Sequence, residues 1–275
     1  MAQFRRIWDS VKEVSAHHIE EEANKSFRIA LVGAPECTLK VFEKLLGPNP
    51  IPEQSETAAL YVLQLEEMPS EGYSTVLLCG NSVSAESLVE ELIKRLPDYH
   101  VAMARRLPGL RSAVCKHLIH ITSVTNAQIA LMTAIPSVIP IAGLFLPAAA
   151  DTIVLTKNQL ILLMRIAASY GETASWGKRW SEMMPIIGGA FGWRAIAREL
   201  AGAVPGGVGI GVKGAIAYSG TYVAGMGALT YFAYGRGLSR EEQKELFARL
   251  RTEAFDTVRG IIQKVPTLRP TKAPK

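Results

Sequence analysis

The chain has 275 residues, of which 48% are hydrophobic and 20% are charged, and its formal net charge is +5. This length suits one large domain or two ordinary ones, and the positive charge favours an anionic partner. Nucleic acid is the weaker choice of partner, because the basic residues are scattered and only 7% of the chain is aromatic. We therefore expect membrane lipid as a partner and no nucleic acid.

The cysteines and the N-terminus indicate a compartment. Cys37, Cys79 and Cys115 are far apart and form no C-x-x-C pair. An odd, sparse set argues against a disulfide framework and for a reducing compartment. The first residues carry charge at once and contain no apolar segment of a secretory signal. We therefore expect the N-terminal domain to lie in the cytoplasm.

Residues 3–25 carry apolar side chains at three- and four-residue spacing, which predicts an amphipathic helix as a first segment, 1–26. Two interpretations are open. The helix docks on the body of the protein, or it lies at a membrane interface with Arg5, Arg6 and Trp8 among the lipid headgroups.

Short apolar runs alternate with helical patterns over residues 27–111. We expect strands at 27–32, 59–65, 74–79 and 100–104, and helices at 38–46 and 84–96. Strands that alternate with helices are typical of a parallel sheet. The fold class predicted for this domain is therefore α/β, with a small, mostly parallel, Rossmann-like sheet.

The first of these strands leads into Gly33 and a loop. The segment Phe27–Lys40 resembles the opening of an Era-like GTPase domain, in which a phosphate loop of pattern G-x-x-x-x-G-K-[ST] joins a strand to a helix. Aligned from Gly33, this chain has Thr38 at the second glycine and Lys40 one residue late, and it lacks the D-x-x-G and N-K-x-D elements. The resemblance implies a degenerate, truncated pseudo-GTPase domain whose remaining nucleotide-binding candidates are Gly33, Thr38 and Lys40.

Two long stretches of the C-terminal half are nearly free of charge. Residues 121–150 contain no Asp, Glu, Lys, Arg or His, and residues 200–235 contain only Lys213. These stretches predict a second domain, 112–265, that is helical and associates with a membrane. Pro136, Pro140 and Pro147 argue for a kinked helix or a helical hairpin rather than one spanning helix. Basic residues flank both stretches on each side, so the orientation stays open.

Helices are expected over 112–133, from Pro147 to Tyr170 with a stop at Gly171, and from the capping box Ser239–Glu242 to 265. Small residues recur every four positions in the glycine-rich stretch, and such rows let helices pack closely. One row is Gly207, Gly211, Ala215 and Ser219, and the other is Gly220, Ala224 and Ala228. Residues 266–275 form a basic, proline-rich tail that we expect to be disordered.

The helix that begins at Pro147 carries a polar seam. Asp151, Asn158 and Arg165 are spaced seven residues apart and so fall near one line of the helix, with Gln159 one position further round. Two interpretations are open. The seam faces solvent or forms hydrogen bonds to neighbouring helices, or it lines a path for a ligand or proton.

The same helix carries a second resemblance. Asp151, Gln159 and Gly171, followed by the glycine-rich stretch to Gly237, are similar to the YcjF-type bacterial domain of unknown function, over about residues 121–238. This resemblance implies a bacterial protein associated with the inner membrane, with no established reaction to carry over.

No motif for catalysis or metal binding stands out. Cys115, His117 and His120 are close in sequence, but no second cluster supplies a fourth ligand, so we expect no metal and no cofactor. The leading hypothesis is a non-enzymatic, membrane-associated scaffold or adaptor with a pseudo-GTPase domain and a protein partner, either a true GTPase or a second copy. The alternatives are a GTP-binding switch with an atypical phosphate loop and a soluble helical interaction protein.

Overall fold

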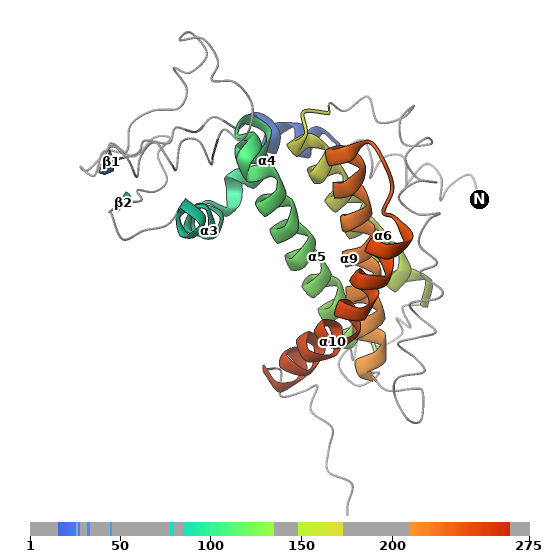
Figure 1. The fold of residues 1–275 in the computed structure, drawn as a ribbon. Helices are drawn as coiled ribbons and strands as arrows, with labels where there is room; N and C mark the ends of the chain where they lie inside the picture. Colours follow the sequence, from blue (N-terminus) through green and yellow to red (C-terminus); the bar gives the residue numbers. More distant parts are fainter. Residues whose placement is uncertain are drawn as a thin grey trace, which may run out of the picture. The chain divides into compact units, whose positions relative to one another are not determined.

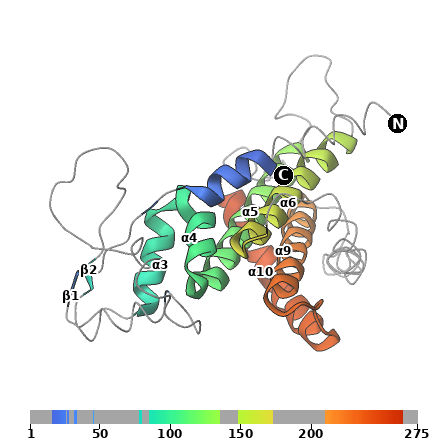
Figure 2. The ribbon, with the colours of Figure 1, turned by 90° about the horizontal axis from the view of Figure 1, so that it is seen from above.

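The structure, a computed structural model, describes residues 16–25, 27, 32–33, 45, 78–79, 85–134, 148–172 and 210–264. Helices dominate this part of the chain (Figures 1 and 2). They are residues 16–24, α3 (Ala85–Arg95), α4 (His100–Arg106), α5 (Arg111–Thr133), α6 (Ala148–Ser169), α9 (Ile210–Tyr234) and α10 (Arg240–Lys264). Two 3-10 turns, η2 (Pro97–Tyr99) and η3 (Pro108–Leu110), flank α4.

The Rossmann-like α/β sheet is not seen in the described residues, and that prediction is wrong. Their β structure is a two-residue parallel pair between β1 (Val32–Gly33) and β2 (Leu78–Cys79). So short a pair cannot form the apolar layer on which the helices of an α/β domain pack. The predicted strand 59–65 lies outside the described residues, as does the predicted helix 38–46 apart from Leu45.

The segment 100–104, predicted as a strand, forms most of α4 instead. All five of its side chains are buried, so the run shows neither the alternation of a half-buried strand nor the period of an amphipathic helix. Pro97 and Pro108 begin the turns on either side. Between them, the alanines and Met103 favour a helix through their intrinsic propensity, a signal that hydropathy alone does not carry.

The chain divides into two compact units. The first unit comprises Met1–His117 and Met164–Ser175, and the second comprises Leu118–Leu163 and Trp176–Lys275. In the first unit, the fully buried side chains of Met103, Leu107 and Leu110 form the centre of the core around α4 and η3.

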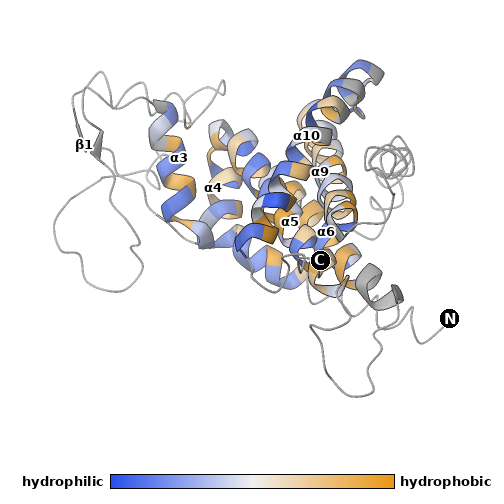
Figure 3. Ribbon diagram, turned by 90° about the horizontal axis from the view of Figure 1, so that it is seen from below, coloured by the Kyte–Doolittle hydropathy of each residue, from blue (hydrophilic) through white to orange (hydrophobic). Residues whose placement is uncertain are grey.

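In the second unit, α9 is the most apolar of the described helices, and most of its side chains are buried or half-buried. Among its described side chains only Lys213, Ala233 and Tyr234 are exposed. Figure 3 shows that hydrophilic residues are frequent along α10 and scarce along α9. None of the helices in the described ranges is both long and apolar enough to cross a bilayer. The nearly uncharged helix α9 is therefore packed mainly within the protein.

Two glycines of α9 allow the second-unit part of α5 to come close. A Cβ atom on Gly225 would lie 2.5 Å from Ile119 Cγ1, and one on Gly214 would lie 2.9 Å from a leucine of α5. These glycines are not members of the predicted rows. Gly211 would make only an ordinary contact at 3.8 Å, and Gly220 has nothing within 4 Å. Close helix packing is present, but glycines outside the predicted rows make the closest contacts.

The helix ends follow the sequence signals. Gly171, with φ of 83°, follows the end of α6, and Gly235, with φ of 68°, follows the end of α9, as the left-handed conformation at a helix end requires. The capping box before α10 is also confirmed. The Ser239 amide donates to Glu242 Oε2 at 2.6 Å, and the Glu242 amide donates to Ser239 Oγ at 3.1 Å.

Candidate functional site

The predicted nucleotide-binding residues are placed only in part. Gly33 ends β1, where it pairs with Cys79 of β2. Thr38 and Lys40 lie outside the described residues. The structure therefore brings no phosphate-binding group together with Gly33 in the described residues.

The predicted seam of α6 is divided between different contacts. Asn158 and Gln159 belong to the second unit and form hydrogen bonds with side chains of α5 and α9. Arg165 belongs to the first unit, where it pairs with Glu22 of the segment 16–24. Asp151 lies within α6, but its side chain is outside the described ones.

Asn158 and Gln159 are part of an uncharged network in the second unit. Asn126 Nδ2 donates to Thr221 Oγ1 at 2.8 Å, and Asn158 Nδ2 donates to Asn126 Oδ1 at 2.8 Å. Gln159 Nε2 donates to the same Thr221 oxygen at 3.2 Å, and Thr221 donates to the carbonyl of Ala217 at 2.9 Å. Asn126 and Thr221 are fully buried. Thr221 thus uses its one proton and both lone pairs, as a buried hydroxyl should.

This amide network joins three helices and contains no titratable group. Amides and aliphatic hydroxyls neither accept nor release protons near neutral pH, so the network cannot act as a general acid or base. In an apolar interior, however, each of its hydrogen bonds is strong and directional. The arrangement therefore fixes the register of α5, α6 and α9 relative to one another within the second unit.

A second polar cluster joins α5, α9 and α10. The buried Tyr218 hydroxyl donates to Glu253 Oε1 at 2.5 Å and lies 3.2 Å from His120 Nδ1. Tyr222 stacks on Tyr218, and its hydroxyl accepts a hydrogen bond of 2.8 Å from Arg249. The phenol proton is given to Glu253, so His120 Nδ1–H is assigned as the donor to the phenol oxygen.

The tyrosines of this cluster are held in their neutral form. Burial, followed by the hydrogen bond to Glu253, raises the pKa of Tyr218, and burial also raises the pKa of Tyr222. A phenol of raised pKa does not become a base near neutral pH, so Tyr218 serves as a fixed hydrogen-bond donor. The cluster therefore attaches the charged helix α10 to the apolar helix α9.

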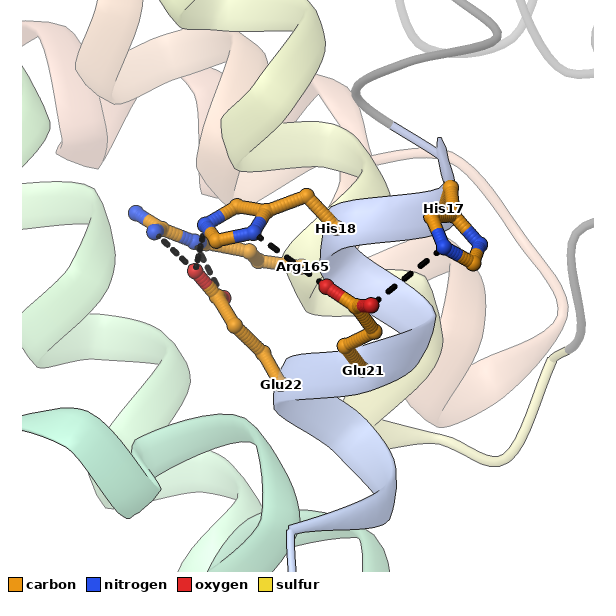
Figure 4. A network of polar contacts seen from close by, with 5 residues as sticks. All are labelled: His17, His18, Glu21, Glu22 and Arg165. Carbon is orange, nitrogen blue, oxygen red and sulfur yellow. Dashed lines mark hydrogen bonds and ion pairs between the residues drawn. The ribbon is translucent and has the colours of Figure 1, made fainter.

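The first unit contains a network of charged groups, shown in Figure 4. Arg165 Nε and Nη2 donate to the two carboxylate oxygens of Glu22 at 2.9 and 2.6 Å. His18 Nε2 lies 3.3 Å from the same carboxylate, and His17 Nε2 lies 3.3 Å from Glu21. The Arg165–Glu22 pair has the parallel, two-bond geometry that guanidinium groups form with carboxylates and phosphates.

The histidines and the cysteine near the start of α5 serve separate purposes. The Cys115 thiol is buried and hydrogen-bonded to Ser169, and burial raises its pKa to about 12, which makes it unreactive. His117 packs edge-on against His100, whereas His120 contacts Tyr218. In the described ranges, no group of three or more His, Cys, Asp or Glu side chains is arranged to hold a metal ion.

Sequence reasoning did not identify Asn126, Thr221, Tyr218 or Glu22 as members of these clusters. Asn126 offered one usable signal, a side chain with strong hydrogen-bonding capacity in a long uncharged stretch. The other contacts join residues too far apart in sequence for spacing to reveal them.

Comparisons of the chain with protein-family models, with curated proteins and with solved structures find no match. In the part of the chain that the structure describes, the fold is helical, and the buried polar side chains other than Ser219 have hydrogen-bond partners.

Proposed function

We propose that the protein is a non-enzymatic helical scaffold or adaptor that acts at the surface of the bacterial inner membrane. The observation that carries the scaffold role is the amide network of Asn126, Asn158, Gln159 and Thr221. It joins three helices of the second unit through buried hydrogen bonds between uncharged side chains. A rigid helical body of this kind is suited to presenting surfaces to partners.

The membrane part of the proposal rests on the net charge of +5 and on the resemblance to the YcjF-type domain. The burial of α9 supports association at the surface rather than insertion of this helix, because most of its side chains are already buried or half-buried in the protein. Surface association through basic side chains weakens as salt screens the charges.

Fractionation of cells that produce the full-length chain tests this proposal. We expect the protein in the membrane pellet, with release by high salt or alkaline carbonate and no need for detergent. Release by detergent alone would refute the surface mode and support insertion. Recovery in the supernatant without any wash would refute the membrane role altogether.

The second candidate function is a soluble helical interaction protein, and the burial of α9 within protein favours it. In this case the partner is another protein or a second copy of the chain. Light scattering of the purified protein without detergent tests it. A uniform species that binds no vesicles supports this candidate, and aggregation that only detergent relieves argues against it.

A further inference from the structure

Two arginines of the first unit are neutralised by one short helix. Residues 16–24, here called the acidic strap, carry Glu20, which pairs with Arg105 of α4 at 3.2 Å, and Glu22, which pairs with Arg165 of α6 at 2.6 Å. The Arg165 side chain is 31% exposed and that of Arg105 is 22% exposed, while Glu22 is 14% exposed, so both pairs are half-buried. An arginine stays charged in the protein, so a half-buried guanidinium group that loses its carboxylate needs another anion or water in its place.

Both buried apolar side chains and carboxylates hold the acidic strap in place. Ile19 and Ala23 are its buried side chains, while His17, His18 and Glu21 are exposed. Figure 4 shows Glu22 directed at Arg165, and Glu21 directed at the two histidines. The strap is therefore attached to the first unit by Ile19 and Ala23 and also by its carboxylates, and only the carboxylates can be replaced by another anion.

We propose that the acidic strap covers two anion-binding side chains of the first unit, Arg105 and Arg165. The ligands of these side chains are the phosphate headgroups of anionic lipids, which replace Glu20 and Glu22. A guanidinium group binds carboxylate and phosphate in the same two-bond geometry, so the Glu22–Arg165 pair shows the fit that a phosphate would use. The inference rests on the proposed membrane association and adds its site and its regulation.

Flotation of the full-length protein with vesicles tests the proposal. Vesicles of equal parts phosphatidylglycerol and phosphatidylcholine are compared with phosphatidylcholine alone. The variant E20Q/E22Q frees both arginines, and the variant E21Q/E90Q removes the same amount of charge at two exposed residues of the same unit. We expect E20Q/E22Q to bind the anionic vesicles roughly tenfold more tightly than the wild type, and E21Q/E90Q to change little. Adding R105Q/R165Q to E20Q/E22Q should abolish the gain.

Hydrogen exchange checks that the strap has moved rather than that the protein has unfolded. Peptides that cover residues 16–24 should lose protection in E20Q/E22Q and keep it in E21Q/E90Q, with unchanged helical circular dichroism. If the double variant does not fold, the single variant E22Q takes its place in both the flotation and the hydrogen-exchange measurements.

The outcomes are separable. Two results would refute the proposed role of the strap: equal increases in vesicle binding for E20Q/E22Q and E21Q/E90Q, or an increase that persists after R105Q/R165Q is added. Neither result bears on the proposed membrane association, which is tested by the binding of the wild type alone. Inorganic phosphate at constant ionic strength distinguishes two sources of the ligand. Competition by phosphate supports recognition of the phosphate group itself, whereas arginine-dependent flotation without competition supports recognition at the lipid surface.

Discussion

The substitution Gly225→Ala tests the close contact between α9 and α5. The new Cβ atom would lie 2.5 Å from Ile119 Cγ1 and within 3.2 Å of two further carbons of the same side chain. Ile119 is fully buried and β-branched, so it has no free rotamer into which it can withdraw. Overpacking of this kind costs about 1–3 kcal/mol, whereas alanine gains roughly 1 kcal/mol over glycine in helix propensity. The net change in the free energy of unfolding should be a loss of up to about 2 kcal/mol.

Gly220→Ala is the matched control, because it makes the same change in the same helix with nothing within 4 Å of the added atom. It should raise the free energy of unfolding by about 0.5–1 kcal/mol. Urea denaturation followed by circular dichroism measures both. A double variant, I119A/G225A, should be more stable than the sum of the two single changes implies, since the alanine then fills part of the space left by Ile119. If Gly225→Ala stabilises the protein as much as Gly220→Ala, the close approach of α9 to α5 is wrong.

Three further changes test other parts of the molecule. Burial, opposed by the hydrogen bond to the Ile93 carbonyl, lowers the pKa of His100 below its ordinary 6.5, so the unfolded chain binds a proton that the folded one refuses. The free energy of unfolding should therefore fall as pH drops below about 6.5, by at most about 1.4 kcal/mol per pH unit. Urea denaturation of the wild type and of H100Q at two pH values measures this slope, which the variant should lack. Asn126→Leu leaves the Asn158 amide without its acceptor and should cost about 1–3 kcal/mol, against less than about 0.5 kcal/mol for the exposed Thr125→Ala. Ser239→Ala removes one half of the capping box and should lower the free energy of unfolding by about 1 kcal/mol. Hydrogen exchange should become faster at the start of α10.

The helices of the C-terminal part were predictable because their ends carry strong local signals. Gly171 and the Ser239–Glu242 capping box act within a few residues of the helix that they delimit, so sequence spacing captures them. The sheet prediction failed for the opposite reason. A short run that is buried on all sides, such as 100–104, has no period, and its structure depends on neighbours far away in the chain.

The candidate clusters were less predictable than the helices. The spacing of Asn158 and Gln159 identified side chains that now pair across helices, but it did not identify their partners. His120 and Tyr218 are 98 residues apart, and Arg165 and Glu22 are 143 residues apart. A polar residue in an apolar stretch indicates that a partner exists, because an unpaired buried polar group is costly, yet only the folded chain selects that partner.

The two units use polar groups in physically different ways, and this difference bears on function. In the second unit the network around Asn126 is buried and uncharged, so the loss of one partner exposes another to the full cost of desolvation. In the first unit the pairs of Arg105 and Arg165 are charged and partly exposed, so salt weakens them and a phosphate can take the place of a carboxylate. The buried network of the second unit is suited to holding helices rigidly together, whereas the charged pairs of the first unit are suited to a surface that binds different anions. On this reasoning raised salt should loosen the acidic strap well before it disturbs the helices of the second unit, and hydrogen exchange at increasing salt would show the two effects separately.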